Sequence, residues 1–84
     1  MTLDRINAGE TVRITAIDGS GLLRRRLLDM GLTPRTVVQV TKLAPLGDPM
    51  VLSLRGYELS IRKEDASRVR VDGSAERGGG NRDD

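Results

Sequence analysis

The stretch LLRRRLLDMGLTP, residues 22–34, decides the fold of this chain. Leu23, Leu27 and Met30 recur at helical spacing and share one face, while Arg25 lies opposite. A helix this short does not persist alone in water, because nucleation is costly and few hydrogen bonds follow it. The rest of the chain must therefore supply a surface that receives the Leu23 face.

Both ends of this helix carry sequence signals. Ser20 is placed to cap the first turn. Gly31 stands where a left-handed residue ends a helix, and Leu32 can pack back onto the last turn. We therefore predict a short helix over residues 22–30, with four structural residues: Leu23, Leu27, Met30 and Gly31.

The segments on either side of the helix read as strands. Val12 and Ile14 alternate with polar residues, and Met50, Leu52 and Leu54 do the same, which is typical of half-buried strands. Five short strands are predicted in this way, at residues 11–17, 36–43, 50–55, around Leu59 and Ile61, and at 68–71, with one helical turn at 63–67. A sheet of this size cannot cover its own apolar face while flat, so we expect a mainly β fold in which it curls into a small, partly open barrel. The helix between the first and second strands covers one open end or side.

The composition excludes several kinds of site. The chain has no Cys and no His, so the usual ligands of zinc and of ferrous iron are missing and we predict no metal site. Adjacent Glu64 and Asp65 do not face each other, and Gly19 to Gly21 lacks the Lys of a phosphate-binding loop. We therefore expect no catalytic residue and no cofactor: the chain is not an enzyme and works by binding another protein.

Nucleic acid is not favoured as a partner. Tyr57 is the only aromatic residue, and one ring cannot form a stacking platform for single strands or a groove for proline-rich peptides. The net charge of +2 is also smaller than the clustered excess typical of nucleic-acid binders.

The domain boundary follows from the carboxyl end. Residues 73–84 contain three consecutive glycines and almost nothing apolar, which favours a disordered tail after a folded domain at residues 1–72. No apolar run suggests a signal peptide or a membrane span, so we expect a cytoplasmic protein.

Three motifs together resemble the ferrous iron transport protein A (FeoA) family: RRLLDMGLTP at residues 25–34, APLGDP at 44–49 and LSIRKEDA at 59–66. The resemblance implies an SH3-like barrel, shared with the carboxy-terminal domain of diphtheria-toxin-repressor-type regulators. It also implies a bacterial cytoplasmic accessory protein that acts with the ferrous iron permease, a membrane protein with a GTP-binding domain.

One residue departs from the family pattern. Arg35 follows Pro34 where the family usually has Gly, which would adopt a positive φ in a type II turn. Arg disfavours that conformation, so we predict a type I turn here.

Two segments are candidate contacts with the permease. Arg24, Arg25 and Arg26 form the densest positive cluster, and arginine pairs well with carboxylates. The stiff loop 44–49 contributes Leu46, Gly47 and Asp48, because Leu46 has no obvious core partner. The plainer interpretations are a solvated helix face and a simple hairpin connection.

Other functions stay open at this point. The runner-up is an SH3-like regulatory domain that acts in trans on an iron-dependent transcriptional regulator. A small RNA-binding barrel is a weaker alternative, and a weak homo-oligomer is also open.

Overall fold

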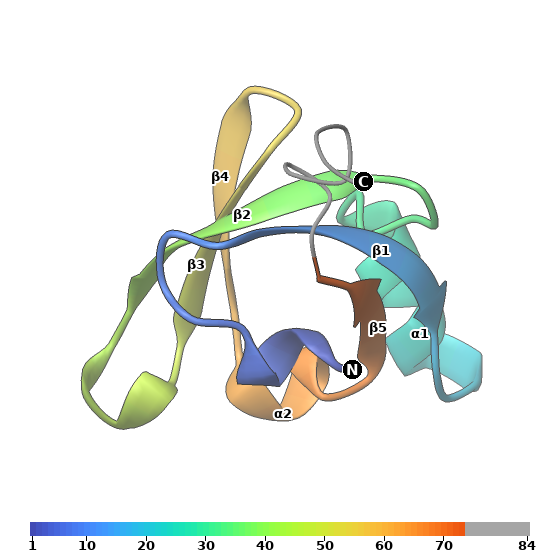
Figure 1. The fold of residues 1–84 in the computed structure, drawn as a ribbon. Helices are drawn as coiled ribbons and strands as arrows, with labels where there is room; N and C mark the ends of the chain where they lie inside the picture. Colours follow the sequence, from blue (N-terminus) through green and yellow to red (C-terminus); the bar gives the residue numbers. More distant parts are fainter. Residues whose placement is uncertain (74–84) are drawn as a thin grey trace.

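The computed structural model describes residues 1–73, so the tail predicted at 73–84 lies outside the described residues except for Gly73. Figure 1 shows a curled sheet with α1 packed at one side. The elements, in chain order, are η1 (Leu3–Arg5), β1 (Thr11–Ile17), α1 (Gly21–Asp29), β2 (Val37–Leu43), η2 (Pro45–Gly47), β3 (Met50–Leu54), β4 (Tyr57–Ile61), α2 (Lys63–Ala66) and β5 (Val69–Asp72).

The five strands form one antiparallel sheet in the order β4-β3-β2-β1-β5. The register shifts between Ile14 and Ala16 on β1 and between Val40 and Lys42 on β2. Such irregularities bend a strand and increase its twist, and the sheet here curls around its buried face without closing. The predicted mainly β, five-stranded, partly open barrel with one helix between its first two strands is confirmed.

The core lies inside the curl and is built from aliphatic side chains. Val12, Ile14, Val38, Val40 and Leu52 come from the inner face of the sheet and are buried. They alternate with exposed or half-buried neighbours, because successive side chains of a strand point to opposite faces. The period of two in the sequence therefore located the inner face correctly.

Helix α1 packs onto this core as its spacing predicted. Leu27 is 1% exposed, and Leu23, Leu28 and Met30 pack partly buried against the cluster. Leu28 had not been expected at this contact. Ser20 occupies the N-cap position in an extended conformation, but its side chain makes no capping hydrogen bond.

The carboxyl end of α1 is a Schellman cap. Gly31 has a φ of +103°, its N–H donates to the Leu28 carbonyl (3.0 Å), and the Leu32 N–H donates to the Leu27 carbonyl (3.1 Å). The Tyr57 hydroxyl, at the start of β4, donates to the Met30 carbonyl (2.5 Å). A Cβ at position 31 would overlap this hydroxyl. Glycine is therefore required here both by its backbone conformation and by its neighbour.

The turn after the helix corrects one prediction. The Thr36 N–H donates to the Thr33 carbonyl (3.1 Å) and Arg35 has a φ of +78°, so the turn is of type II and the type I prediction was wrong. Neighbouring contacts hold Arg35 in this conformation: its N–H donates to the Ile14 carbonyl (2.7 Å). Tertiary hydrogen bonds thus outweigh the local preference of an arginine.

The β3–β4 hairpin is tied to the same turn. Arg55 and Gly56 have φ values of +50° and +85°, as in a type I′ turn. The Arg55 guanidinium donates to the hydroxyls of Thr33 (3.2 Å) and Thr36 (2.8 Å). Together with the Tyr57 hydroxyl, these bonds join the hairpin tip to the end of the helix.

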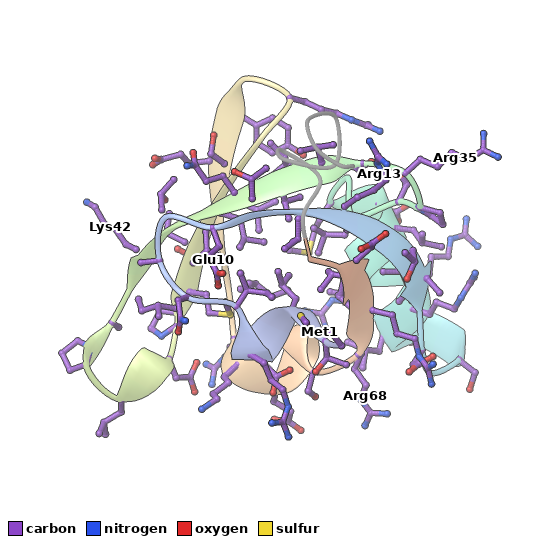
Figure 2. The ribbon with its side chains drawn as sticks, in the orientation of Figure 1. Met1, Glu10, Arg13, Arg35, Lys42 and Arg68 are labelled. Atoms are coloured by element: carbon purple, nitrogen blue, oxygen red, sulfur yellow. The ribbon has the colours of Figure 1, made fainter. Side chains whose placement is uncertain are left out.

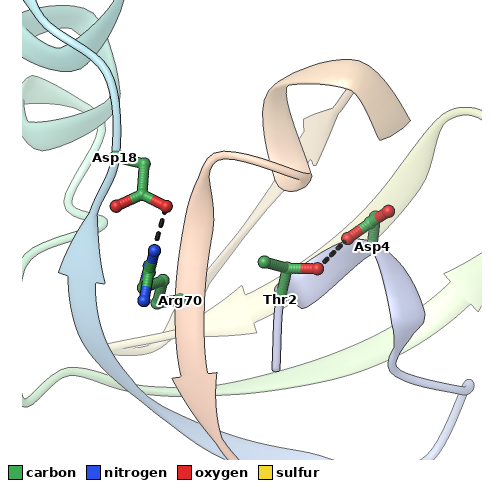
Figure 3. Close-up of polar contacts among 4 residues, drawn as sticks. All are labelled: Thr2, Asp4, Asp18 and Arg70. Carbon is green, nitrogen blue, oxygen red and sulfur yellow. Dashed lines mark hydrogen bonds and ion pairs between the residues drawn. The ribbon is translucent and has the colours of Figure 1, made fainter.

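Strand β5 is the edge strand on the other side of the sheet, and the first residues of the chain lie against it. Figure 3 shows the Arg70–Asp18 ion pair (2.7 Å), which links β5 to the end of β1, and the Thr2–Asp4 hydrogen bond (2.5 Å). The hydrogen bond and charge of Asp18 raise the pKa of Arg70, without effect near neutral pH because arginine is already protonated there. Both side chains of the ion pair are exposed, so its contribution to stability is small.

The requirement for glycine at position 31 can be tested by its effect on the free energy of unfolding. Gly31→Ala should lower the free energy of unfolding by about 2–4 kcal/mol, because it adds backbone strain and displaces the Tyr57 hydroxyl from Met30. Gly9→Ala is the matched control: Gly9 has a φ of +94° but no atom within 4 Å of a Cβ, so only the strain of about 1 kcal/mol applies. Equal losses in urea unfolding would show that the Tyr57 contact contributes nothing.

Candidate docking surfaces

The predicted arginine cluster is exposed on α1. Arg24, Arg25 and Arg26 are all exposed, and none of them forms an ion pair with another described residue. Consecutive helical residues lie about 100° apart, so the three side chains spread over the solvent side of the helix. The cluster is therefore a broad positive surface.

Leu22 is a functional candidate that our sequence analysis missed. It is 80% exposed, and Arg25 and Arg26 follow it at three and four positions, so all three lie on neighbouring parts of the helix surface. The signal was present in the sequence, because a face defined by Leu23, Leu27 and Met30 cannot also bury Leu22. An exposed leucine beside arginines is a combination suited to protein contact.

Arg35 extends the positive surface beyond the helix. Figure 2 shows its side chain pointing away from the body of the domain, from the turn that follows α1. It is exposed, and its positive φ is rare for a residue other than glycine. We call Leu22, Arg24, Arg25, Arg26 and Arg35 the α1 surface.

The second candidate segment is the β2–β3 loop, and Leu46 lies at its tip. The Gly47 N–H donates to the Ala44 carbonyl (2.7 Å), and Leu46 has a φ of +71° in this tight turn. Its side chain is 96% exposed. Leu46 buries almost none of its surface, so the turn around it holds its left-handed backbone, and the tip is a pre-formed, exposed apolar surface.

Asp48 has an anchoring role in the same loop. Its carboxylate accepts a hydrogen bond from the Lys63 N–H (3.0 Å), at the first residue of α2. Gly47 also lies near this helix, because a Cβ there would be 3.9 Å from the Lys63 ammonium. The loop is therefore fixed at its base while Leu46 projects from it.

The two candidate segments do not form one surface. In Figure 1, α1 lies at the right of the domain and the β2–β3 loop at the lower left. One compact patch on a partner cannot contact both. The domain thus presents a positive surface at one end and an apolar tip at the other.

The side chains and helices of residues 1–73 bear on metal binding and on membrane crossing. Within that range, no group of three or more acidic, His or Cys side chains is placed to hold a metal ion. No helix in the same range has the length and apolar character needed to cross a membrane.

A curled, open sheet of five antiparallel strands with one covering helix defines the class of protein, which is a small barrel-like β domain. This domain presents arginines at one end and the exposed Leu46 at the other. The model of the FeoA domain family matches residues 1–73. The chain belongs to the FeoA domain family.

Two relatives show the match in detail. Over 72 residues, 86% of this chain, it is 33% identical to a Porphyromonas gingivalis Fe(2+) transport protein A/Fe(2+) transporter FeoB fusion protein, and it spans 8% of that protein. The solution structure of a FeoA-like protein from Clostridium acetobutylicum is 34% identical, with a TM-score of 0.83 over 90% of this chain and 88% of the other.

More distant structures establish the fold type. Stenotrophomonas maltophilia FeoA, described as a procaryotic SH3 domain protein, is 22% identical and superposes with a TM-score of 0.75 over 86% of this chain and 89% of its own. A manganese-dependent transcriptional repressor is 13% identical, with a TM-score of 0.79 over 87% of this chain and 36% of the repressor. The SH3-like fold and its likeness to metal-dependent repressors are confirmed.

The backbone strain at Arg35 can be measured by comparing the stability of two variants. Arg35→Gly should be about 1 kcal/mol more stable than Arg35→Ala, because only glycine adopts a φ of +78° without strain. Both variants lose the same charge, so thermal melts of the pair isolate the backbone effect. Identical melting temperatures would mean that Arg35 stores no strain.

Proposed function

We propose that this domain is a non-enzymatic accessory protein of bacterial ferrous iron uptake. In this proposal it works in the cytoplasm, binds the GTP-driven ferrous iron permease and alters the activity of that permease. The observation that carries the proposal is the Porphyromonas gingivalis relative, in which a segment 33% identical to this chain shares one polypeptide with an Fe(2+) transporter.

A fusion supports a physical partnership. Joining two modules raises their effective concentration to the millimolar range, so a weak contact between them is occupied. The matched segment is 8% of the fusion protein, so transport itself belongs to the remainder of that chain. A separate chain of this family achieves the same contact only by binding.

The α1 surface supports an acidic partner. Its four arginines form no ion pair with a described residue, so their charges are available to carboxylates. Leu22 lies among them and supplies apolar area that becomes buried on contact. We therefore assign the first contact with the permease to this surface.

The Leu46 tip supports a second contact at the far end of the domain. Because the tip is pre-formed, a partner binds it without ordering a flexible loop. Two contacts on opposite ends let the domain bind two parts of a permease at once. If the domain binds one arrangement of these two parts more tightly than another, its binding shifts the permease toward the more tightly bound arrangement.

A transcriptional role is the alternative, and the likeness to the manganese-dependent repressor favours it. That likeness concerns the fold alone, and the domain corresponds to 36% of the repressor. In this alternative the chain acts in trans on an iron-dependent regulator. Co-purification with such a regulator, and not with the permease, would support it.

The proposal is tested by titrating the isotope-labelled chain with the soluble GTP-binding domain of the permease, and separately with the full-length permease in nanodiscs. We expect amide shifts in α1 and in the turn that holds Arg35. Arg25→Glu should weaken binding about tenfold, since a like charge then faces the acidic patch. Arg5→Glu is the matched control: it makes the same charge change on η1, and its affinity should stay near wild type.

Two results would count against the proposal. Binding with equal loss in the Arg5→Glu and Arg25→Glu variants would show a general charge effect instead of a defined surface. Absence of binding to the full-length permease in every nucleotide state would show that the domain does not bind the permease.

A further inference from the structure

Strand β4 is the open edge of the sheet. The opposite edge strand, β5, is covered by the first residues: Thr2 bridges to Arg70, and the Val71 N–H donates to the Met1 carbonyl (2.9 Å). Among residues 1–73, β4 pairs with β3 alone. An uncovered edge is a template for another strand.

The register shows which backbone groups of β4 are free to pair. Leu54 and Tyr57 close a two-residue hairpin, and such a closing pair exchanges both of its hydrogen bonds. Hydrogen-bonded and non-hydrogen-bonded pairs alternate along an antiparallel ladder, so Glu58 and Ser60 belong to the latter. Their N–H and C=O groups therefore point outward, away from β3.

Arg62 continues this outward series. It follows β4 with φ −72° and ψ 147°, an extended conformation, before α2 begins at Lys63. Glu58, Ser60 and Arg62 are all exposed, and neither charged residue forms an ion pair within residues 1–73. The outward-facing residues of this edge are therefore acidic at Glu58, neutral at Ser60 and basic at Arg62, with Ser60 at the centre.

We propose that the β4 edge pairs with the β4 edge of a second copy of this chain, antiparallel about a two-fold axis at Ser60. The order of charges selects this occupant. Pairing two identical strands in opposite directions sets Glu58 of each copy opposite Arg62 of the other, which gives two ion pairs between the copies. No other residue of the edge then faces a like charge.

The backbone bonds fit the same register. Each Ser60 N–H reaches the Ser60 carbonyl of the other copy, and each Arg62 N–H reaches the opposite Glu58 carbonyl. The Arg62 carbonyl already accepts the Ala66 N–H (2.9 Å), so it is left out of the ladder. The pairing therefore rests on four backbone hydrogen bonds and two exposed ion pairs.

An interface this small binds weakly. Antiparallel ladders of a few residues bury little apolar area, and exposed ion pairs are screened by salt. The dimer should form as the protein concentration rises through roughly 0.1–1 mM, and it should weaken in high salt. Fusion to a larger protein or crowding at a partner raises the local concentration into this range.

Sedimentation equilibrium of the full chain tests the proposal with three variants. Glu58→Arg and Arg62→Glu each set like charges opposite across the axis, so each should weaken dimerisation at least about tenfold. The double variant restores opposite charges in exchanged places, so its affinity should return to within about threefold of wild type. The two single variants change net charge in opposite directions, so a shared loss cannot be a net-charge effect.

Amide spectra identify the surface and confirm that each variant is folded. Concentration-dependent shifts should be confined to residues 58–62 and should disappear in the single variants. A wild-type chain that stays monomeric across the concentration range would overturn the proposal. Dimerisation that the single variants leave intact, that the double variant does not recover, or whose shifts fall on α1 would overturn it equally.

Discussion

One hydrogen bond from the β3–β4 hairpin reaches the carboxyl end of α1 directly. The Tyr57 hydroxyl bonds to the Met30 carbonyl across 27 positions of sequence, over a glycine whose Cβ would fill the same space. Helix α1 has nine residues and cannot persist by itself. Its position therefore depends on this contact together with the burial of Leu27 in the core.

The rigidity of the candidate docking surfaces follows from that attachment. Arg24, Arg25 and Arg26 are presented by a helix whose axis is fixed at its carboxyl end, and Arg35 by the turn that the Arg55 guanidinium braces. The Leu46 tip has its own anchor through Asp48 and α2. A partner that meets pre-formed surfaces loses less entropy on binding, which is consistent with the proposed contact with the permease.

Sequence patterns predicted the helices and strands well wherever local spacing alone decides which side chains are buried or which residue ends a helix. The alternation in β1 and β3, the Leu27 face of α1 and the left-handed Gly31 all depend on local spacing, and the structure agrees with each. The exposure of Leu22 follows from the same spacing.

Long-range contacts set the limit of prediction. Arg35 was expected to avoid a positive φ, but its N–H donates to the carbonyl of Ile14, a residue of β1 that lies far from the turn in sequence. Nothing near Tyr57 in the sequence indicates that its hydroxyl meets Met30. The separation of the arginine cluster from the Leu46 loop likewise depends on how the sheet curls, which local spacing does not encode.

The Tyr57 hydroxyl helps to fix α1 on the sheet, and amide hydrogen exchange of the Tyr57→Phe variant tests this role. This variant keeps the ring and removes only the bond to Met30. We expect the Gly31 and Leu32 amides of the helix cap to exchange about tenfold faster than in the wild type, with β1 and β5 amides much less affected. Unchanged protection of the Gly31 and Leu32 amides would show that the Tyr57 hydroxyl has no such role.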